Sequence, residues 1–532
     1  MKLLSIFILG FGVLTQTFAN DNTEDPAQIT IGERLFLETR FAQAYYADVN
    51  KPEPALEKTL TVNKSLPGAY AGQTMNCRAC HLVDEFADHK DGGTRTYSDY
   101  TRMSPIPDRQ DGNMKTGRNS MSLVNISVPL KQGMLFHFDG EFNSMEDLVR
   151  GTLTGRNYGW QAHESNEAIA HIASIIRSDS GNGDLAKEFG GAYRKILNGT
   201  DTSLPKKFIL PAEYRIDIDK AGDQQIVDAV ARLISAYVLD LNFTQDDDGN
   251  YSGSPYDAFL KKNNLPRKPE NNEGLQTYSQ RLLLAVNKIT TPRFISDKDQ
   301  KFSTHKQEFV FAKKELSGMK LFFSPGNKKQ PGGNCVSCHS APHFSDYKFH
   351  NTGLTQLNYD NTHGSNSFNQ LDIPGLKKRN ANHDAYLPAT AKHPKASSRF
   401  RSAIAKQQPG HVDLGVWNIF ANPDMPAPQQ KMQKILCKQA DFKACKNEQL
   451  LDLAIATFKT PVLRDLGHSA PYMHTGQFDR LESAVSLYIT NSAMSREKKL
   501  RNNDPALSET FINLQQVEPL VAFLKSLNED YD

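Results

Sequence analysis

The sequence predicts an all-α protein in two halves, each of which carries one copy of the same short motif. The pattern Cys-x-x-Cys-His occurs once near the amino terminus and once past the middle of the chain. Apolar residues recur at helical spacing in both halves, whereas the alternation typical of strands is weak throughout. Long stretches rich in Gly, Asn and Asp separate the predicted helices, notably at 352–430. The predicted helices lie at 166–176, 224–241, 449–458, 480–488 and 515–527.

The composition is that of a soluble globular protein. The chain has 532 residues, of which 38% are hydrophobic and 23% charged, so it is neither disordered nor embedded in a membrane. The 62 Lys and Arg residues against 60 Asp and Glu residues leave a formal charge of +2. No basic excess therefore indicates nucleic acid, and no acidic excess indicates a cationic partner.

The amino terminus has the pattern of a secretory signal peptide. Lys2 precedes the apolar run 3–13, and Thr17-Phe18-Ala19 forms a small-x-small cleavage site, with cleavage expected after Ala19. An uncleaved anchor is the alternative, although the run is short for a membrane span and no later segment supplies ~20 consecutive apolar residues. We therefore expect an exported, periplasmic protein in an oxidising compartment.

The two C-x-x-C-H motifs predict covalent attachment of two c-type haems. Two thiols at this spacing add to the two vinyl groups of one haem, and the adjacent histidine then ligates the iron. A thioredoxin-type redox pair would not need histidine at both motifs, and a zinc site would have to combine cysteine pairs from distant parts of the chain. The predicted attachment residues are Cys77, Cys80, Cys335 and Cys338, with His81 and His339 as iron ligands.

The two remaining cysteines, Cys437 and Cys445, lack this pattern. In an exported protein such a closely spaced pair typically forms a local disulfide, which here would staple a polar insertion.

The expected domains are residues 28–300 and 308–532, one for each haem motif. Polar, proline-bearing segments at 264–272 and 288–301 indicate a linker between them. The acidic run 246–250 lacks the spacing of a calcium loop and is interpreted as solvated.

Several short motifs resemble those of the bacterial di-haem cytochrome c peroxidase and MauG family. The resemblance covers most of residues 28–528, with insertions at about 43–72 and 355–450. In the first half it rests on the segments 32–36 (GERLF), 117–119 with Asn125, and 137–140 (HFDG). In the second half it rests on 318–322 (GMKLF), 344–346 (FSD), 350–353 (HNTG), 458–464 (FKTPVLR), 471–476 (PYMHTG) and the helix at 481–488.

The resemblance implies two helical, cytochrome c-like domains that face each other. The haem held by His81 would react with peroxide, and the haem held by His339 would relay electrons. A calcium ion between the domains would be bound by Asn119 and the backbone carbonyls of Ser469 and Pro471, oxygen ligands that suit a hard cation.

The second axial ligand of the relay haem departs from the peroxidases. They have a methionine where this chain has Tyr488, and MauG-like members have a tyrosine. A phenolate stabilises ferric iron more than a thioether does. The alternative is that Tyr488 only packs on its helix while Met494 or Met473 ligates.

The acid–base residues of the family are also replaced. Leu148 and Tyr158 stand where the peroxidases have Gln and Glu, Glu141 replaces the Arg of their W-D-G-R segment, and Phe138 replaces its bridging Trp. Cleavage of the peroxide O–O bond needs a group that accepts and returns a proton.

The candidates for this proton transfer are His137, Glu141 and Tyr158, with Arg156 stabilising developing charge. Each has a structural alternative: Glu141 starting a helix, His137 bonded within its loop, and Arg156 paired with Asp139. The sixth position of the first haem could also be filled by His89 or Tyr97.

Three functions remain open on this basis. The first is a peroxidase that reduces hydrogen peroxide to water through a ferryl haem, with electrons from a small donor protein such as a mono-haem cytochrome c or a cupredoxin. The second is a MauG-like enzyme that oxidises aromatic residues of a partner protein. The third is a plain di-haem electron-transfer cytochrome.

The basic runs 377–379 and 399–401 are expected to be a solvated face or a docking patch for an acidic donor. The sequence also leaves open whether the protein forms a homodimer.

Overall fold

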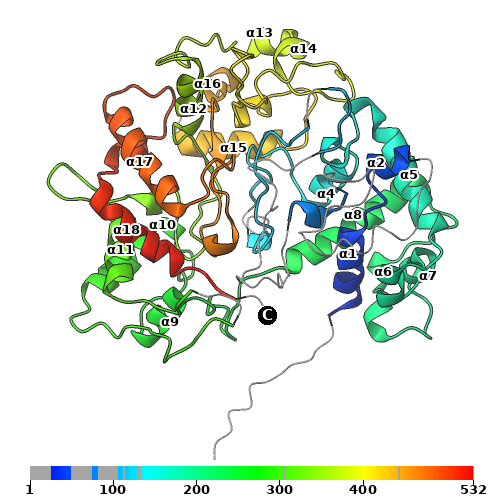
Figure 1. Cartoon of the computed structure of the whole chain (residues 1–532), viewed down its shortest axis with the longest axis horizontal. Coiled ribbons are helices and arrows are strands. Elements are labelled where there is room, and N and C mark those ends of the chain that lie inside the picture. Colours follow the sequence, from blue (N-terminus) through cyan, green and yellow to red (C-terminus); the bar gives the residue numbers. More distant parts are fainter. Residues whose placement is uncertain are drawn as a thin grey trace, which may run out of the picture.

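The computed structural model describes residues 25–48, 75–81, 106–111, 114–128, 133–303, 307–440 and 444–530. The expected signal peptide, His89 and Tyr97 lie outside these residues. The described chain is mainly helical with long loops (Figure 1), so the prediction of a helix-rich protein is confirmed. The described residues form one two-stranded sheet. Among the helices described, none combines the length and apolar character needed to cross a membrane.

The first half is built around one long, buried helix. Helix α8 carries apolar residues on most of its surface, and α1, α4 and α5 pack against it. Gly32 allows α1 to approach α8 closely, because a Cβ atom at this position would collide with the backbone of α8 at Leu233. The helices of this half are α1 (Ala27–Leu37), α2 (Gln43–Ala47), α4 (Met145–Leu153), α5 (Ser165–Ser178), α6 (Asp184–Glu188), α7 (Tyr193–Asn198) and α8 (Asp223–Asp240).

The second half repeats this packing with a different pair of helices. Gly318 lies in α11 where a Cβ atom would collide with the carbonyl of Pro519 in α18. Gly32 and Gly318 open the corresponding segments GERLF and GMKLF, so both segments use glycine at a helix–helix contact. The helices of this half are α9 (Pro255–Lys262), α10 (Leu275–Asn287), α11 (Lys313–Phe323), α17 (Leu481–Arg496) and α18 (Leu514–Lys525).

The hydrophobic cores divide earlier than the expected boundary at 300–308. One buried cluster ends at Val238, and the next begins at Tyr256 and includes Phe259, Tyr278 and Ile295. The supposed linker segments are therefore loops within the second half. Their polar composition is misleading because the apolar residues of α9 and α10 on either side fill the second core.

The insertion forms a third core between the two halves (Figure 1). It starts after β1 (Phe349–His350) and ends at β2 (Phe458–Lys459), and these strands pair antiparallel. Phe458 belongs to β2, so the helix predicted at 449–458 is shorter than expected. The helices of the insertion are α12 (Leu354–His363), α13 (Leu376–Ala381), α14 (His383–Tyr386), α15 (Gln429–Ala440) and α16 (Asn447–Leu453).

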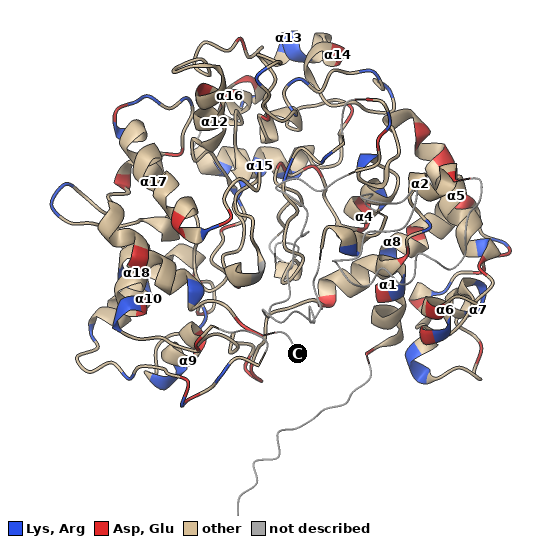
Figure 2. Cartoon of the chain, viewed as in Figure 1, with Lys and Arg blue, Asp and Glu red and all other residues tan. Residues whose placement is uncertain are grey.

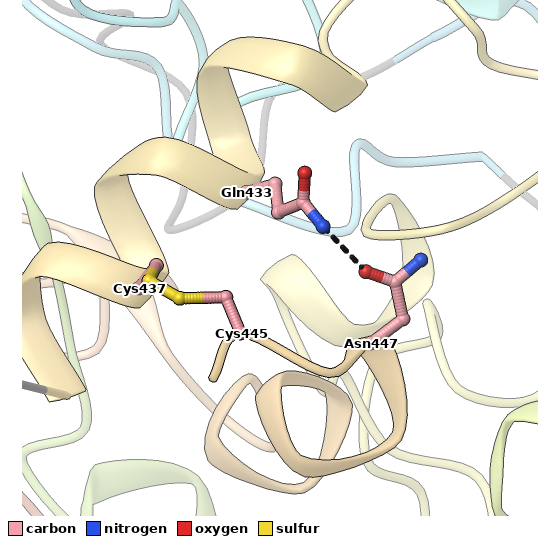
Figure 3. The surroundings of a disulfide bond; sticks show 4 residues. All are labelled: Gln433, Cys437, Cys445 and Asn447. Atoms are coloured by element: carbon pink, nitrogen blue, oxygen red, sulfur yellow. Dashed lines mark hydrogen bonds between the residues drawn. A yellow bond between two sulfur atoms is a disulfide. The ribbon is translucent and has the colours of Figure 1, made fainter. Parts of the chain in front are cut away.

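The predicted disulfide between Cys437 and Cys445 is confirmed. It joins the last turn of α15 to the segment before α16, as Figure 3 shows. Beside it, Gln433 donates a hydrogen bond to Asn447 at 2.9 Å. The pair therefore links two helices of the insertion.

Short 3₁₀ turns join many of these helices, and charged residues of both signs are interspersed along the elements (Figure 2). The turns outside the cysteine motifs are η4 (Arg156–Tyr158), η5 (Ala162–Glu164), η6 (Lys206–Phe208), η7 (Ala212–Tyr214), η9 (Val416–Asn418), η10 (Leu466–His468) and η11 (Pro505–Glu509).

The helix pairing of the second half can be tested at Gly318. We expect Gly318→Ala to lower the free energy of unfolding by about 1–3 kcal/mol, because the new methyl group must push α11 away from α18. Gly274→Ala is the control, since a Cβ atom there meets no atom within 4 Å. Thermal unfolding followed by circular dichroism compares the two, and equal midpoints would contradict the close contact.

Candidate active site

The first C-x-x-C-H motif forms a single tight turn against α1. Residues Cys77–Ala79 are the 3₁₀ turn η3, and the backbone amide of His81 donates to the carbonyl of Cys77 at 2.9 Å. Asn76 fixes the turn, because its side chain accepts from the Ala79 amide at 3.0 Å and donates to the Leu37 carbonyl at 2.9 Å. Both thiols and the histidine therefore sit on one turn, as attachment of one haem requires.

The second motif has the same form and a fixed histidine ring. Residues Cys335–Ser337 form η8, and the His339 amide donates to the Cys335 carbonyl at 2.8 Å. Nδ1 of His339 donates to the carbonyl of Phe344 at 3.0 Å. This bond assigns the proton to Nδ1 and leaves Nε2 available to iron, which is the arrangement expected of a haem-ligating histidine.

The residues present fit two covalently held haems. The four motif cysteines are half-buried and take part in no disulfide. Burial lowers the pKa of His81 to about 4, and it does the same for His339, so both imidazoles are neutral at physiological pH. The neutral form is the one that binds iron.

Tyr488 lies on α17 beside the second motif. Burial raises the pKa of its phenol, and the neighbouring Cys338 and Cys335 raise it further, while His350 lowers it. Tyr488 is therefore close to the thiols that would hold the second haem, as a ligand of that haem must be.

His350 was not assigned a role from the sequence, and it lies in the same neighbourhood. Its Nε2 is 3.0 Å from Asp346 and its Nδ1 is bonded to Asp504, with the Cys338 sulfur close by. Burial alone would lower the pKa of His350, but Cys338 and the two carboxylates raise it well above its usual value. His350 therefore forms an ion-paired cluster with Asp346 and Asp504 next to the second attachment site.

A tight hairpin carries two of the three predicted proton-transfer residues, His137 and Glu141. The amide of Phe136 donates to the carbonyl of Phe142 at 2.9 Å, and His137 has a positive φ of 63° at the start of the turn. This turn brings His137, Asp139 and Glu141 together, with the His137 Nδ1 atom 3.2 Å from the Glu141 carboxylate. His137 is also close enough to His81 to lower its pKa.

Glu141 is held by an arginine from the insertion. Arg401 donates to both carboxylate oxygens, at 3.2 and 2.5 Å. Burial alone would raise the pKa of Glu141, but the charge of Arg401 and the hydrogen bonds from His137 and Arg401 hold it well below its usual value. Glu141 is thus an ionised acceptor rather than a proton donor or a helix-start residue.

Asp139, on the same hairpin, also contacts Arg401. Its side chain is fully buried and lies 2.6 Å from Arg118 and 3.1 Å from Arg401. Arg118 also donates to both oxygens of Asp413, at 2.5 and 2.9 Å. The sequence did not reveal this network, because 260 residues separate Glu141 from Arg401.

The basic runs of the insertion are only in part the solvated face that was expected: Lys377 and Lys378 are exposed, but each run also turns one arginine inward. Arg379 is fully buried and donates to the carbonyls of Trp417 and Phe420. Arg401 turns inward to Asp139 and Glu141. Each of the two runs therefore contributes an arginine to the interior of the insertion or to its contact with the hairpin.

Aromatic rings line the contact between the hairpin and the second half. The His474 ring stacks on Phe458 at 3.7 Å and meets Phe138 edge-on at 6.4 Å. Burial lowers the pKa of His474 to about 4, so this ring is neutral. Lys459, next to Phe458, connects the hairpin to these stacked rings, because its backbone amide donates to the Phe138 carbonyl at 2.6 Å.

Two predicted residues lie elsewhere. The hydroxyl of Tyr158 is 3.2 Å from the Cys77 sulfur, on the first attachment turn rather than with His137 and Glu141. Arg156 pairs with Asp111 at 2.7 and 2.9 Å, not with Asp139. The prediction for these two residues was wrong because the hairpin, and not η4, brings the ionisable groups together.

The residues expected to bind calcium are partly assembled. The Asn119 side chain donates to the Pro471 carbonyl at 2.6 Å, which brings two of the expected groups together. The Ser469 hydroxyl donates to the Asp465 carbonyl at 3.0 Å. Calcium would need the Asn119 amide turned so that its oxygen faces the Pro471 carbonyl, since calcium takes oxygen ligands.

Comparison with known proteins identifies cytochrome c peroxidases as relatives. The chain is 21% identical over 337 residues to cytochrome-c peroxidase IdrP1 of Pseudomonas sp. (strain SCT), covering 63% of this chain and 65% of the relative. It is 37% identical over 76 residues to cytochrome-c peroxidase IdrP2 of the same strain, covering 14% of this chain and 18% of the relative. The chain thus matches less than two thirds of the length of either relative. The resemblance to cytochrome c peroxidases is confirmed.

Two solved structures align with most of the chain at low identity. A MauG-like protein associated with microbial copper homeostasis has a TM-score of 0.45 and 16% identity, covering 96% of this chain and 91% of that chain. The diheme peroxidase BthA from Burkholderia thailandensis has a TM-score of 0.40 and 15% identity, covering 95% and 86%. No protein-family model matches the chain.

The ligand role of Tyr488 can be tested by redox titration. If its phenol ligates the second haem, Tyr488→Met should raise one of the two midpoint potentials by roughly 100 mV or more, because axial ligands set haem potential over about 0.8 V. The other potential should not move. Two unchanged potentials would make Tyr488 a packing residue and turn attention to Met494 or Met473.

Proposed function

We propose that the chain is a periplasmic di-haem c-type peroxidase that reduces hydrogen peroxide to water with electrons from a small redox protein. The observation that carries this proposal is the pair of C-x-x-C-H turns in one chain, each with a half-buried, neutral histidine. The similarity of the chain to two cytochrome-c peroxidases supports the same proposal.

The first haem would be the site of peroxide reduction, and His137 would move the protons. When bound, the haem iron supplies the redox chemistry. The ionised Glu141 accepts a hydrogen bond from Nδ1 of His137, which leaves Nε2 of the neutral ring able to accept a proton. His137 can then take a proton from one peroxide oxygen and return it to the other, and Arg401 keeps Glu141 in its acceptor form.

Electrons would enter at the second haem and cross the aromatic contact to the first. The rings of Phe138, His474 and Phe458 come from both halves and touch in series. We infer that a small donor protein, a mono-haem cytochrome c or a cupredoxin, docks on the second half.

A second candidate is oxidation of a partner protein's aromatic residues by the MauG-like route. Tyr488 favours it, because a phenolate ligand would stabilise the second haem in its oxidised state. In that case the substrate would be a protein surface and a small donor would turn over slowly.

The proposal is tested by mixing the di-haem protein with hydrogen peroxide and reduced mono-haem cytochrome c. A peroxidase oxidises many equivalents of donor per enzyme, and a MauG-like enzyme changes its own absorbance with little donor turnover. An electron-transfer cytochrome shows no response to peroxide, and that result would overturn the proposal.

The role of Glu141 in orienting His137 is tested by Glu141→Gln. We expect kcat/KM for peroxide to fall on the order of 100-fold, because the neutral amide no longer fixes the proton on Nδ1 of His137. Arg156→Gln is the matched control, since it also breaks an ion pair in the first half but away from the hairpin. Similar losses in both variants would show that the effect is structural.

A further inference from the structure

The insertion contains a second cluster of ligand-type side chains, remote in sequence from both haem motifs. His383 begins α14, His393 follows in the next loop, and Asp424 lies after η9. One ligand atom from each residue lies within 4.8 Å of the others. We propose that His383, His393 and Asp424 bind one divalent transition-metal ion, independently of the function proposed above.

Hydrogen bonds fix which nitrogen of each ring faces the cluster. Nε2 of His383 donates to the Pro388 carbonyl at 3.0 Å, so its Nδ1 is free to coordinate. Nδ1 of His393 donates to the Asp384 carboxylate at 2.7 Å, so its Nε2 is free. Metal-bound histidines are typically oriented by such a bond from the second nitrogen to a carbonyl or carboxylate.

Both free nitrogens face the same oxygen. His383 Nδ1 is 3.9 Å and His393 Nε2 is 4.0 Å from Oδ2 of Asp424. Two lone pairs directed at a carboxylate oxygen repel it, and two protonated rings stacked at 4.0 Å would repel each other. A single cation between the three atoms removes both conflicts.

The burial and the charges around the cluster suit a bound ion. The side chains of His383 and Asp424 are 4% and 7% exposed, whereas His393 is 37% exposed and would leave a path for water. The Thr390 hydroxyl donates to Asp424 at 2.6 Å. Lys392 lies 3.5 Å from the same carboxylate but is largely exposed, so it can swing away.

The ligand set selects the class of metal. Two imidazole nitrogens and one carboxylate favour zinc, copper or nickel over calcium or magnesium, which prefer oxygen. Ligand atoms on tetrahedral zinc are about 3.3 Å apart, so each nitrogen must move about 0.6–0.7 Å closer to Oδ2 of Asp424 to share one ion with it. The ion would connect the segment 383–393 to Asp424, and the stretch of chain between His393 and Asp424 carries Arg401.

The test is zinc binding to the di-haem protein after dialysis against a chelator, with bound metal counted by mass spectrometry. We expect one zinc per chain, not displaced by magnesium or calcium. Asp384→Asn should weaken binding roughly 10- to 100-fold, and His393→Asn and Asp424→Asn should weaken it more. His163→Asn, at an exposed histidine of the first half, should bind as the wild type does.

Absence of a saturable zinc site in the wild type would overturn the proposal, as would unchanged binding in His393→Asn and Asp424→Asn. The haem absorption spectrum of each variant checks that it folds. If a variant does not fold, anomalous scattering from a zinc-soaked crystal of the wild type decides, because the ion must appear between these three side chains.

Discussion

The buried carboxylate of Asp139 is the constraint on which the candidate site depends. It is removed from water and is stabilised there by Arg118 and Arg401, which come from the first half and from the insertion. Removing one partner of a buried ion pair costs about 3–5 kcal/mol, because the remaining charge is left without compensation. The hairpin that bears His137 and Glu141 is thereby fixed to two distant parts of the chain.

Lys459, at the end of the insertion, also holds the hairpin in place through two hydrogen bonds. Lys459 donates from its amide to the Phe138 carbonyl and from its ammonium to the Leu135 carbonyl at 3.1 Å. Burial lowers the pKa of Lys459 to about 8, which the charge of Asp139 partly opposes. Gly140 lies so close to Phe349 and Met432 that a side chain there would collide with them. The insertion is therefore part of the site and not an appendage to it.

The sequence predicted the features that are local along the chain. The C-x-x-C-H turns, the disulfide from Cys437 to Cys445 and the long helices each depend on residues close in sequence, and periodicity and spacing reveal them. The boundary between the halves was missed, because polar loops inside the second core have the composition of a linker. The roles of Arg401 and of the histidine pair His383 and His393 were missed because folding, not spacing, brings their partners together.

The account is tested most directly by combining Glu141→Gln and Arg401→Gln and measuring the rate constant for reaction with peroxide in single-turnover experiments. If Arg401 acts by keeping Glu141 ionised and in contact with His137, the double variant should react about as slowly as Glu141→Gln alone. Losses that multiply would show that the two side chains act independently, and they would contradict the role of the buried network in orienting His137.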